Sequence, residues 1–303
     1  MADSTSDPGK TIVVSGATDG MGKAVTLSRL ARGDRLVAVG SNPAKFTALI
    51  AEAERLGAAD RLHTVRADLS SIAENRRVID EIAARWSAVD ALLLFANRHS
   101  PRRRETVDGL EYTFALYYLS RYLLSRGLSP LLDAAADPVI VTVAGVGTTT
   151  GSIAWDDPQS THGYRAIRAM VQGARANDLL GVGFAQEQAG RARFVMYHPG
   201  FTRSGDVSPF PLPVRILLRV AAALKARPVA ESIAPIDGFI DHPPAQPLTA
   251  IDRGEPVDPA LPTLDPADAR RLAELTEQIL ARSTRPPDTC DRHHITGCRS
   301  VSS

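Results

Sequence analysis

The chain has 303 residues, of which 44% are hydrophobic and 23% are charged, and its formal net charge is +1. This composition predicts a folded protein with a sizeable core, and the balanced charge argues against a nucleic-acid partner, which would require a basic excess. The polar N-terminus lacks the apolar core of a signal peptide, and no apolar run is as long as a membrane span. We therefore expect a cytoplasmic protein without a membrane span.

The basic residues are unevenly divided between lysine and arginine. Lysine occurs only at Lys10, Lys23, Lys45 and Lys225, and the remaining basic residues are arginines. A coding bias explains such a ratio, but its consequence is chemical. Any mechanism that needs a lysine has only these four candidates.

Short apolar segments rich in β-branched residues alternate with segments of helical spacing from residue 11 to about residue 200. The predicted strands are Thr11–Ser15, Arg35–Gly40, Leu62–Val65, Ala88–Phe95, Pro138–Val143 and Arg193–Tyr197. Predicted helices between them include Met21–Gly33, Ala44–Leu56 and Ile72–Trp86. Continuous apolar strands separated by helices predict an α/β fold with a doubly wound parallel sheet, buried on both faces.

The remaining segments predict a single domain with additions. We expect residues 1–9 to be a flexible N-terminus, residues 10–282 to be the domain, and residues 283–303 to be a disordered polar tail. Within the domain, the proline-rich span 205–265 is expected to form a small substrate cap that includes a helix at roughly Val214–Ala226. A last helix is predicted over Pro266–Arg282, with Asp265 as its N-cap.

A glycine-rich loop follows the first predicted strand directly and opens a helix. Its residues are Gly16, Ala17, Thr18, Asp19, Gly20, Met21 and Gly22. Glycines let the backbone turn and let a pyrophosphate approach the helix N-terminus, where free N–H groups attract anions. A purely structural turn is the alternative, but the position between the first strand and the first helix favours dinucleotide binding.

Several further segments occur in the order found in one family. TIVVSGATDGMGKAV, VGSNPAKF, RADLSS, DALLLFANR, TVDGLEYTF, VIVTVAG, ARANDLLGVGFA and YHPGFTRS together span about residues 10–205. This pattern resembles the short-chain dehydrogenases/reductases, particularly their retinol-dehydrogenase-like branch. The resemblance implies a Rossmann-type fold, a nicotinamide cofactor, a small-molecule substrate, and a homodimer or homotetramer formed through the fourth and fifth helices.

The resemblance also implies a set of cofactor contacts. Asp68 and Leu69 match a pair that contacts adenine, and Pro199 and Gly200 match a turn beside the nicotinamide. No acidic residue follows the second strand, which favours NADP(H) over NAD(H). The complete set comprises Gly16, Thr18, Asp19, Gly20, Met21, Gly22, Ser41, Asn42, Lys45, Asp68, Leu69, Ala96, Asn97, Pro199, Gly200 and Ser204.

The family's catalytic residues are asparagine, serine, tyrosine and lysine, and this chain departs from all four. The matching positions hold Tyr117, Ala144 or Gly145, Met170, and Ala174. An alternative pair, Tyr164 and Arg168, has the spacing of a tyrosine followed by a cation. Because residues advance about 100° each around a helix, that pair lies on the wrong face unless ANDLL (Ala176–Leu180) is the wrong anchor for the alignment or Tyr164 precedes the helix and reaches inward from the loop.

Three other groups are candidates for chemistry or binding. Tyr117 can donate a hydrogen bond or a proton, with aromatic packing as the alternative. Thr148, with Thr149 and Thr150, can supply a hydroxyl near the lost serine, or can belong to an ordinary polar loop. The run Arg102–Arg104 can hold an anionic substrate, or can be a solvated face. We expect no metal site, although Cys290, His293, His294 and Cys298 lie close together in the tail.

Three functions remain open from the sequence. The first is an NAD(P)(H)-binding oxidoreductase that acts on a small carbonyl or alcohol through a non-standard proton relay. The second is a redox-neutral enzyme of specialised metabolism, such as a cyclase, isomerase or dehydratase. The third is a non-catalytic NADP-binding protein.

Overall fold

The computed structural model describes residues 9–98, 100–187, 190–200 and 228–283. Within these residues, eight strands form one sheet in the order β3-β2-β1-β4-β5-β6-β7-β8. All pairs are parallel except β7 with β8. The strands are β1 (Thr11–Ser15), β2 (Arg35–Gly40), β3 (Leu62–Arg66), β4 (Ala91–Leu94), β5 (Val139–Val143), β6 (Arg193–His198), β7 (Leu248–Asp252) and β8 (Glu255–Pro256). The predicted doubly wound parallel sheet is confirmed.

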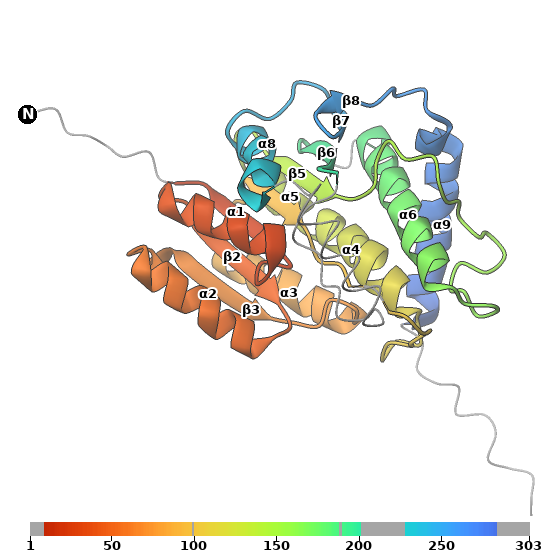
Figure 1. The fold of residues 1–303 in the computed structure, drawn as a ribbon, viewed down its shortest axis with the longest axis horizontal. Coiled ribbons are helices and arrows are strands. Elements are labelled where there is room, and N and C mark those ends of the chain that lie inside the picture. Colours follow the sequence, from red (N-terminus) through yellow and green to blue (C-terminus); the bar gives the residue numbers. More distant parts are fainter. Residues whose placement is uncertain (1–8, 99, 188–189, 201–227, 284–303) are drawn as a thin grey trace, which may run out of the picture.

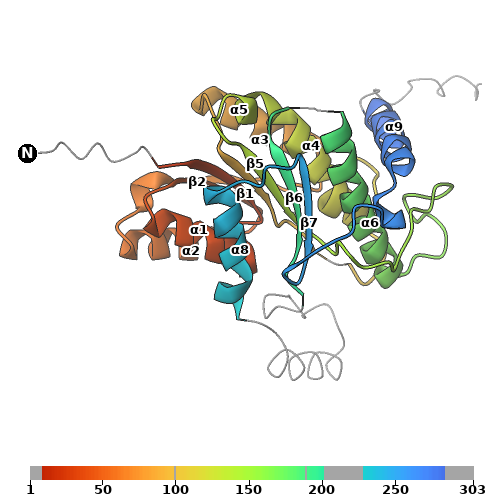
Figure 2. The ribbon, with the colours of Figure 1, turned by 90° about the horizontal axis from the view of Figure 1, so that it is seen from above.

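Helices cover both faces of this sheet (Figures 1 and 2). One face carries α1 (Gly20–Ala31), α2 (Pro43–Arg55) and α8 (Val229–Asp241). The other face carries α3 (Ile72–Arg85), α4 (Ser120–Gly127), the short α5 (Ser129–Asp133) and α6 (Ala166–Gln186), with α9 (Pro266–Ser283) outside α6. Short 3₁₀ turns occur at η1 (Ala59–Arg61) and η3 (Pro262–Leu264), and a π-helical segment, η2 (Phe114–Leu119), leads into α4.

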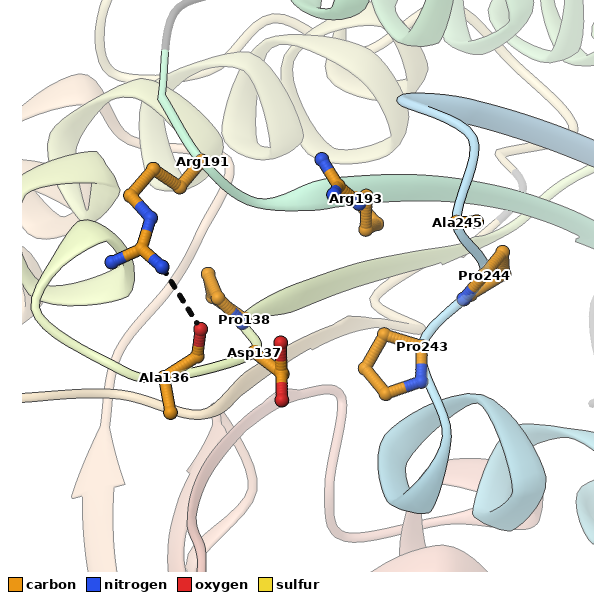
Figure 3. Close-up of a pocket in the computed structure, with 8 residues that line it drawn as sticks. All are labelled: Ala136, Asp137, Pro138, Arg191, Arg193, Pro243, Pro244 and Ala245. Carbon is orange, nitrogen blue, oxygen red and sulfur yellow. Dashed lines mark hydrogen bonds between the residues drawn. The ribbon is translucent and has the colours of Figure 1, made fainter.

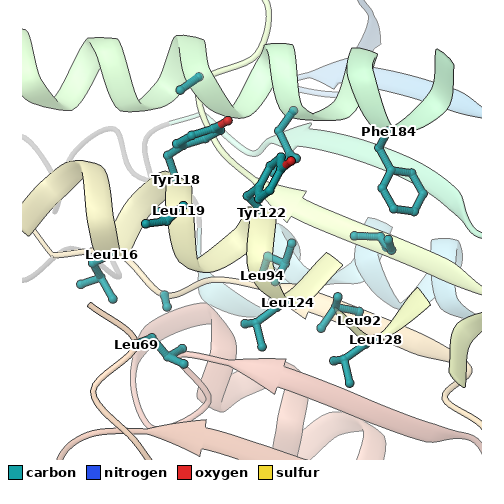
Figure 4. Close-up of a cluster of buried hydrophobic side chains, with 14 of the residues drawn as sticks. Leu69, Leu92, Leu94, Leu116, Tyr118, Leu119, Tyr122, Leu124, Leu128 and Phe184 are labelled. Carbon is teal, nitrogen blue, oxygen red and sulfur yellow. The ribbon is translucent and has the colours of Figure 1, made fainter. Parts of the chain in front are cut away.

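The core is divided by the sheet, because successive side chains of a strand point to opposite faces. In β4, Leu92 and Leu94 join the cluster under α3, α4 and α6, whereas Leu93 joins the cluster under α1, α2 and α8. Figure 4 shows Leu92 and Leu94 beneath Tyr118 of η2 and Tyr122 of α4. Fully buried strands of this kind explain why the sequence shows continuous apolar runs rather than alternation.

The span 205–265, which the sequence analysis assigns to a substrate cap, has a different structure where it is described. Helix α8 packs on α1, and β7 pairs in parallel with β6. Prolines at 243, 244, 247 and 256 surround β7. Because proline is rare in strands, the sequence pattern did not predict a strand here. Residues 205–227, with the predicted helix Val214–Ala226, lie outside the described residues.

An ion-pair network anchors α8 to α1. Arg29 donates from Nε to Asp34 at 2.5 Å and from Nη1 to Asp241 at 2.7 Å. Burial lowers the pKa of Arg29, but the hydrogen bonds and charges of the two carboxylates outweigh it and raise that pKa overall. Helix α8 is thus held on the same layer of the fold as α1, and β7, which follows it, extends the main sheet.

Helix α9 packs on α6 and also contacts η2 and α4. Tyr118 and Thr276 share a hydrogen bond of 2.8 Å between their hydroxyls, and Tyr122 donates to Glu277 at 2.6 Å. These contacts attach α9 to the outer side of the helical segment that carries both tyrosines. Among the described residues, no helix combines the length and the apolar character needed to cross a membrane.

Candidate functional site

The glycine loop connects β1 to α1 with a backbone that side chains would obstruct. Gly16 and Gly20 have φ values of 75° and 51°, a region that favours glycine. A Cβ on Gly22 would lie 2.3 Å from the carbonyl oxygen of Gly16, and one on Gly16 would lie 2.8 Å from the nitrogen of Ala96. Glycine is therefore required for the close packing of this loop at the N-terminus of α1, where helix N–H groups can attract an anion such as a pyrophosphate.

Asp19 and Lys45 connect the glycine loop to the start of α2. Asp19 accepts a hydrogen bond from the nitrogen of Gly20 at 2.8 Å, which caps α1, and its carboxylate forms an ion pair with Lys45. Asn42 caps α2 by accepting from the nitrogen of Lys45 at 3.2 Å. The lysine compensates for a carboxylate that would otherwise repel an anion at this helix terminus, and Ser41 is exposed beside it.

The other expected cofactor contacts follow the carboxyl ends of neighbouring strands. Asp68 follows β3 and accepts from the nitrogen and the hydroxyl of Ser70, at 3.0 and 2.7 Å. Leu69 beside it is buried, Ala96 is buried after β4, and Asn97 is exposed. Pro199 and Gly200 follow β6, and Ser204 lies outside the described residues. Parallel strands bring these turns to one edge of the sheet, where open α/β sheets bind ligands.

A pocket of about 270 Å³ lies at the opposite edge (Figure 3). Its lining comes from residues that precede β5, begin β6 and precede β7, including Asp137, Arg191 and Pro243. Arg191 donates to the carbonyl of Ala136 at 3.1 Å there. This pocket contains none of the residues expected to bind cofactor or substrate.

Tyr117 lies in the π-helical segment η2 and is buried against α6. A Cβ on Gly173 would lie 2.7 Å from Cδ1 of Tyr117, so the glycine makes room for the ring. Asn177 donates from Nδ2 to the carbonyl of Tyr117 at 2.9 Å. Burial raises the pKa of Tyr117, the charge of Arg121 lowers it, and that of Asp178 raises it further. Local π-helical geometry is frequent at functional sites.

The positions expected for the lost serine and lysine lie next to each other. A Cβ on Gly145 would lie 3.5 Å from Cβ of Ala174 and 3.6 Å from Oγ1 of Thr148. Thr148 donates from that hydroxyl to the carbonyl of Gly145 at 2.7 Å. The structure thus brings the Thr148 hydroxyl to the place where a serine at Gly145 would begin, whereas Thr149 and Thr150 are exposed.

Tyr164 precedes α6 and points toward the loop after β4. Its hydroxyl donates to the carbonyl of Ser100 at 2.8 Å. Burial is the largest effect that raises its pKa, and the charged groups that act on it are Glu111 and Arg103. Arg168 is exposed on α6 and is not among them. Tyr164 therefore does precede the helix, but the charged groups that act on it are Glu111 and Arg103 and not Arg168.

The arginines of the run 102–104 are largely engaged with the protein. Arg103 donates to Glu105 at 2.5 Å and to the carbonyl of Gln159 at 3.3 Å. The guanidinium of Arg104 lies 4.5 Å from the centre of the Tyr112 ring. These contacts favour the interpretation as a packed surface over an open anion clamp.

A buried cation that the sequence analysis missed lies beside Tyr117. Arg121 is 0% exposed, and its Nη1 donates to Oγ1 of Thr142 at 2.5 Å and to the carbonyl of Val143 at 3.0 Å. Its Nη2 donates to the carbonyl of Ala96 at 3.4 Å. No carboxylate of the described residues pairs with it. The signal in the sequence was its spacing, one helical turn after Tyr117.

A histidine–aspartate pair at the same edge was also missed. Nδ1 of His198 lies 2.8 Å from Oδ1 of Asp252, and Arg253 donates to Oδ2 of Asp252 at 2.9 Å. A Cβ on Gly147 would lie 2.8 Å from Cβ of Asp252, so the loop after β5 packs against this pair. Sequence pattern could not join His198 to Asp252 because β7 was not predicted.

No metal-binding cluster occurs in the part of the chain that the structure describes. The cysteines and histidines between Cys290 and Cys298 lie outside that part.

Comparison with known sequences finds a family model and several relatives that resemble this chain. Residues 10–157 match the family model described as short chain dehydrogenase. The chain is 29% identical over 201 residues to a candidate daunorubicin C-13 ketoreductase, DnrU, of Streptomyces sp. (strain C5), covering 65% of this chain and 67% of that protein. It is 27% identical over 199 residues to retinol dehydrogenase 13 of Homo sapiens, covering 65% of this chain and 60% of that protein. These relatives therefore share only part of their length with this chain.

Comparison with solved structures supports the fold. An uncharacterised protein of Mycobacterium paratuberculosis gives a TM-score of 0.67 at 21% identity, covering 90% of this chain and 93% of that chain. RhlG of Pseudomonas aeruginosa, in an active-site complex with NADP, gives 0.59 at 21% identity, covering 84% and 99%. Over residues 10–157 and in these relatives the chain is similar to short-chain dehydrogenases/reductases, including a retinol dehydrogenase, and the solved structures share its fold.

Proposed function

We propose that this protein is an NADP(H)-dependent oxidoreductase that interconverts a carbonyl and an alcohol on a small molecule, with Tyr117 as its proton donor. The observation that carries the proposal is the glycine loop at the N-terminus of α1. It follows the carboxyl end of β1, at the edge of the sheet where Gly145 and Thr148 follow β5 and where Arg121 joins Tyr117 to the ends of β4 and β5. The family is one of oxidoreductases, and solved relatives of the same fold bind NADP. The preference for NADP(H) rests on Ser41 and Lys45 and on the lack of an acidic residue after β2.

The residues of this chain supply binding, orientation and a proton. The backbone of the glycine loop would hold the pyrophosphate, and Lys45 would meet the ribose phosphate from the start of α2. When bound, the nicotinamide supplies the hydride chemistry. The Tyr117 hydroxyl would donate its proton to the substrate oxygen during reduction and would accept one during oxidation. The Thr148 hydroxyl would orient that oxygen in place of the lost serine.

A redox-neutral reaction is the second candidate, and a specific observation favours it. Gly145 and Ala174 face each other without a polar side chain where the family places serine and lysine. The absence of a serine and a lysine side chain at these two positions suits a cyclase, isomerase or dehydratase, for which orientation of a reactive substrate supplies much of the acceleration. In that case the cofactor would be structural or absent.

Two measurements separate these functions. Calorimetry with NADP(H) and NAD(H) tests binding, and NADPH oxidation with a panel of aldehydes, ketones and enones tests hydride transfer. The proposal expects binding and turnover with at least one acceptor. Binding without turnover on any acceptor would reject it, and product formation from a substrate without added cofactor would establish the redox-neutral alternative.

A further inference from the structure

We propose that Arg121 serves as the cation beside the proton donor Tyr117, the role for which the expected lysine is missing. Tyr117 in η2 and Arg121 in α4 then form a Tyr-x-x-x-Arg pair. In this view Arg121 is a positioning residue that acts through Tyr117. The inference rests on the proposed function, because it assigns the electrostatic partner of the proton donor named there.

The geometry joins the two side chains directly. Tyr117 and Arg121 are four residues apart on a continuous helical path through η2 and α4, so they lie on neighbouring turns. The guanidinium carbon of Arg121 lies 4.7 Å from the centre of the Tyr117 ring, which is cation–π distance. Each side chain therefore fixes the position of the other.

The location of the pair matches the space that the altered α6 leaves. Arg121 donates to Thr142 and Val143 at the end of β5, and to Ala96 after β4. The Tyr117 ring packs on Gly173, next to Ala174 at the position of the lost lysine. A tyrosine and a cation thus reach the region between β5 and α6 from the opposite helix.

Burial makes this cation electrostatically strong. Arg121 is 0% exposed and has hydroxyl, carbonyl and aromatic partners, but no carboxylate among the described residues. A desolvated cation without a counter-ion stabilises a nearby negative charge far more than a solvated one. The phenolate that Tyr117 forms when it gives up its proton is such a charge.

The other charges that face Tyr117 come from α6. Asp178 raises the pKa of Tyr117, and its carboxylate is paired with Arg175 on the same helix. Arg175 also donates to the carbonyl of Thr148 at 2.7 Å, and it is not among the groups that shift the pKa of Tyr117. Arg121 is the cation that contacts the ring itself.

A purely structural role for Arg121 is the competing explanation. Its three hydrogen bonds connect the ends of β4 and β5, and removal of any buried charge disturbs packing. The two roles differ in one measurable quantity. A structural bridge leaves the ionisation of Tyr117 unchanged once the fold is intact, whereas an electrostatic partner shifts it.

The test measures that ionisation without requiring turnover. Protein labelled with 3-fluorotyrosine would be titrated by fluorine NMR, and the signal of Tyr117 would be assigned from its loss in Y117F. We expect R121M to raise the ionisation midpoint of Tyr117 by about one pH unit or more. R121K, which keeps the charge, is expected to stay nearer the wild type.

Arg126 provides a matched control on the same helix. Its guanidinium lies 4.6 Å from the centre of the Tyr122 ring and pairs with Glu187. R126M is expected to leave the Tyr117 midpoint unchanged. If R121M does not fold, as judged by circular dichroism, R121K and R121Q replace it, with a higher midpoint expected for the neutral glutamine.

The outcomes separate this inference from the proposed function. An unchanged Tyr117 midpoint in a folded neutral variant overturns the inference, even if the enzyme is active. A raised midpoint in a protein that turns over no acceptor supports the pair and rejects the oxidoreductase proposal. In active protein, the pH profile of kcat/KM for alcohol oxidation should move to higher pH in R121M and remain near the wild type in R121K.

Discussion

The edge of the sheet where the strands end has two regions that differ in what they retain. The region after β1 and β2 holds the glycine loop, whose proposed binding groups are backbone N–H groups at the start of α1. The region between β5 and α6 has Gly145 and Ala174 where a serine and a lysine were expected, and a Cβ on Gly145 would lie 3.5 Å from that of Ala174. A backbone site survives wide changes in sequence, because its donors are N–H groups, whereas a site made of side chains disappears with a few substitutions.

The largest effect should come from the region that has changed. We expect Y117F to lower kcat by about 10² to 10⁴, the usual contribution of a positioned proton donor, while leaving cofactor affinity unchanged. Steady-state kinetics and calorimetry on the same protein measure both. Y118F is the control, because that hydroxyl bonds Thr276 on α9 and not the site. Full activity in Y117F would contradict the role of Tyr117 as proton donor and would leave His198, paired with Asp252, as the candidate for that role.

The backbone site should fail when its geometry is obstructed. Since a Cβ at Gly22 would lie 2.3 Å from the carbonyl of Gly16, we expect G22A to weaken NADP(H) binding by roughly a hundredfold. Calorimetry is the measurement, and far-UV circular dichroism confirms folding. G238A on α8 should bind normally, because nothing lies within 4 Å of a Cβ there.

The altered region also carries a pH-dependent contribution to stability. Burial raises the pKa of Asp178 to about 7, and the charge of Arg175 only partly opposes this. An acid with a raised pKa stabilises the fold when protonated, so this contribution is complete below about pH 4 and is lost as the pH rises through about 7. We expect the unfolding free energy of the wild type to fall over this range relative to D178N, in denaturant titrations at each pH.

Asp252 offers the opposite sign as a control. Burial would raise its pKa, but the hydrogen bond from Arg253 and the charge of His198 outweigh burial and lower it. Its stabilising contribution is therefore present above the ordinary aspartate pKa and is lost as the pH falls.

A D178N protein whose stability follows the same pH dependence as the wild type would show that Asp178 does not titrate in this way.

The smallest effect should concern cofactor choice. We expect K45M to weaken NADP(H) binding about fivefold while leaving NAD(H) binding nearly unchanged, because an exposed lysine–phosphate contact contributes about 1 kcal/mol. Calorimetry with both cofactors measures the ratio. Equal losses for the two would indicate that Lys45 serves only to neutralise Asp19.

Parts of the fold and site could be predicted from sequence because they are local. Thr11–Ser15 and Arg35–Gly40 are apolar runs, and they are strands with the predicted bounds. The glycine loop was found because its residues are contiguous. By contrast, Leu248–Asp252 is short and surrounded by proline, and its partner β6 lies about fifty residues away in the chain, so hydrogen bonding to the sheet decides its structure.

The same distinction applies to the residues that carry chemistry. The sequence by itself determined the strands of the sheet and the glycine loop after β1, and it predicted a departure from the catalytic residues of short-chain dehydrogenases, since each depends on residue type at a known position. Only the tertiary structure decided that Arg121 is buried against Tyr117, that Thr148 reaches the place of the lost serine, and that His198 meets Asp252. The meeting of His198 and Asp252 joins strands distant in sequence, which no local pattern encodes, and the burial of the neighbouring Tyr117 and Arg121 depends on how β4, β5 and α6 pack around their helix.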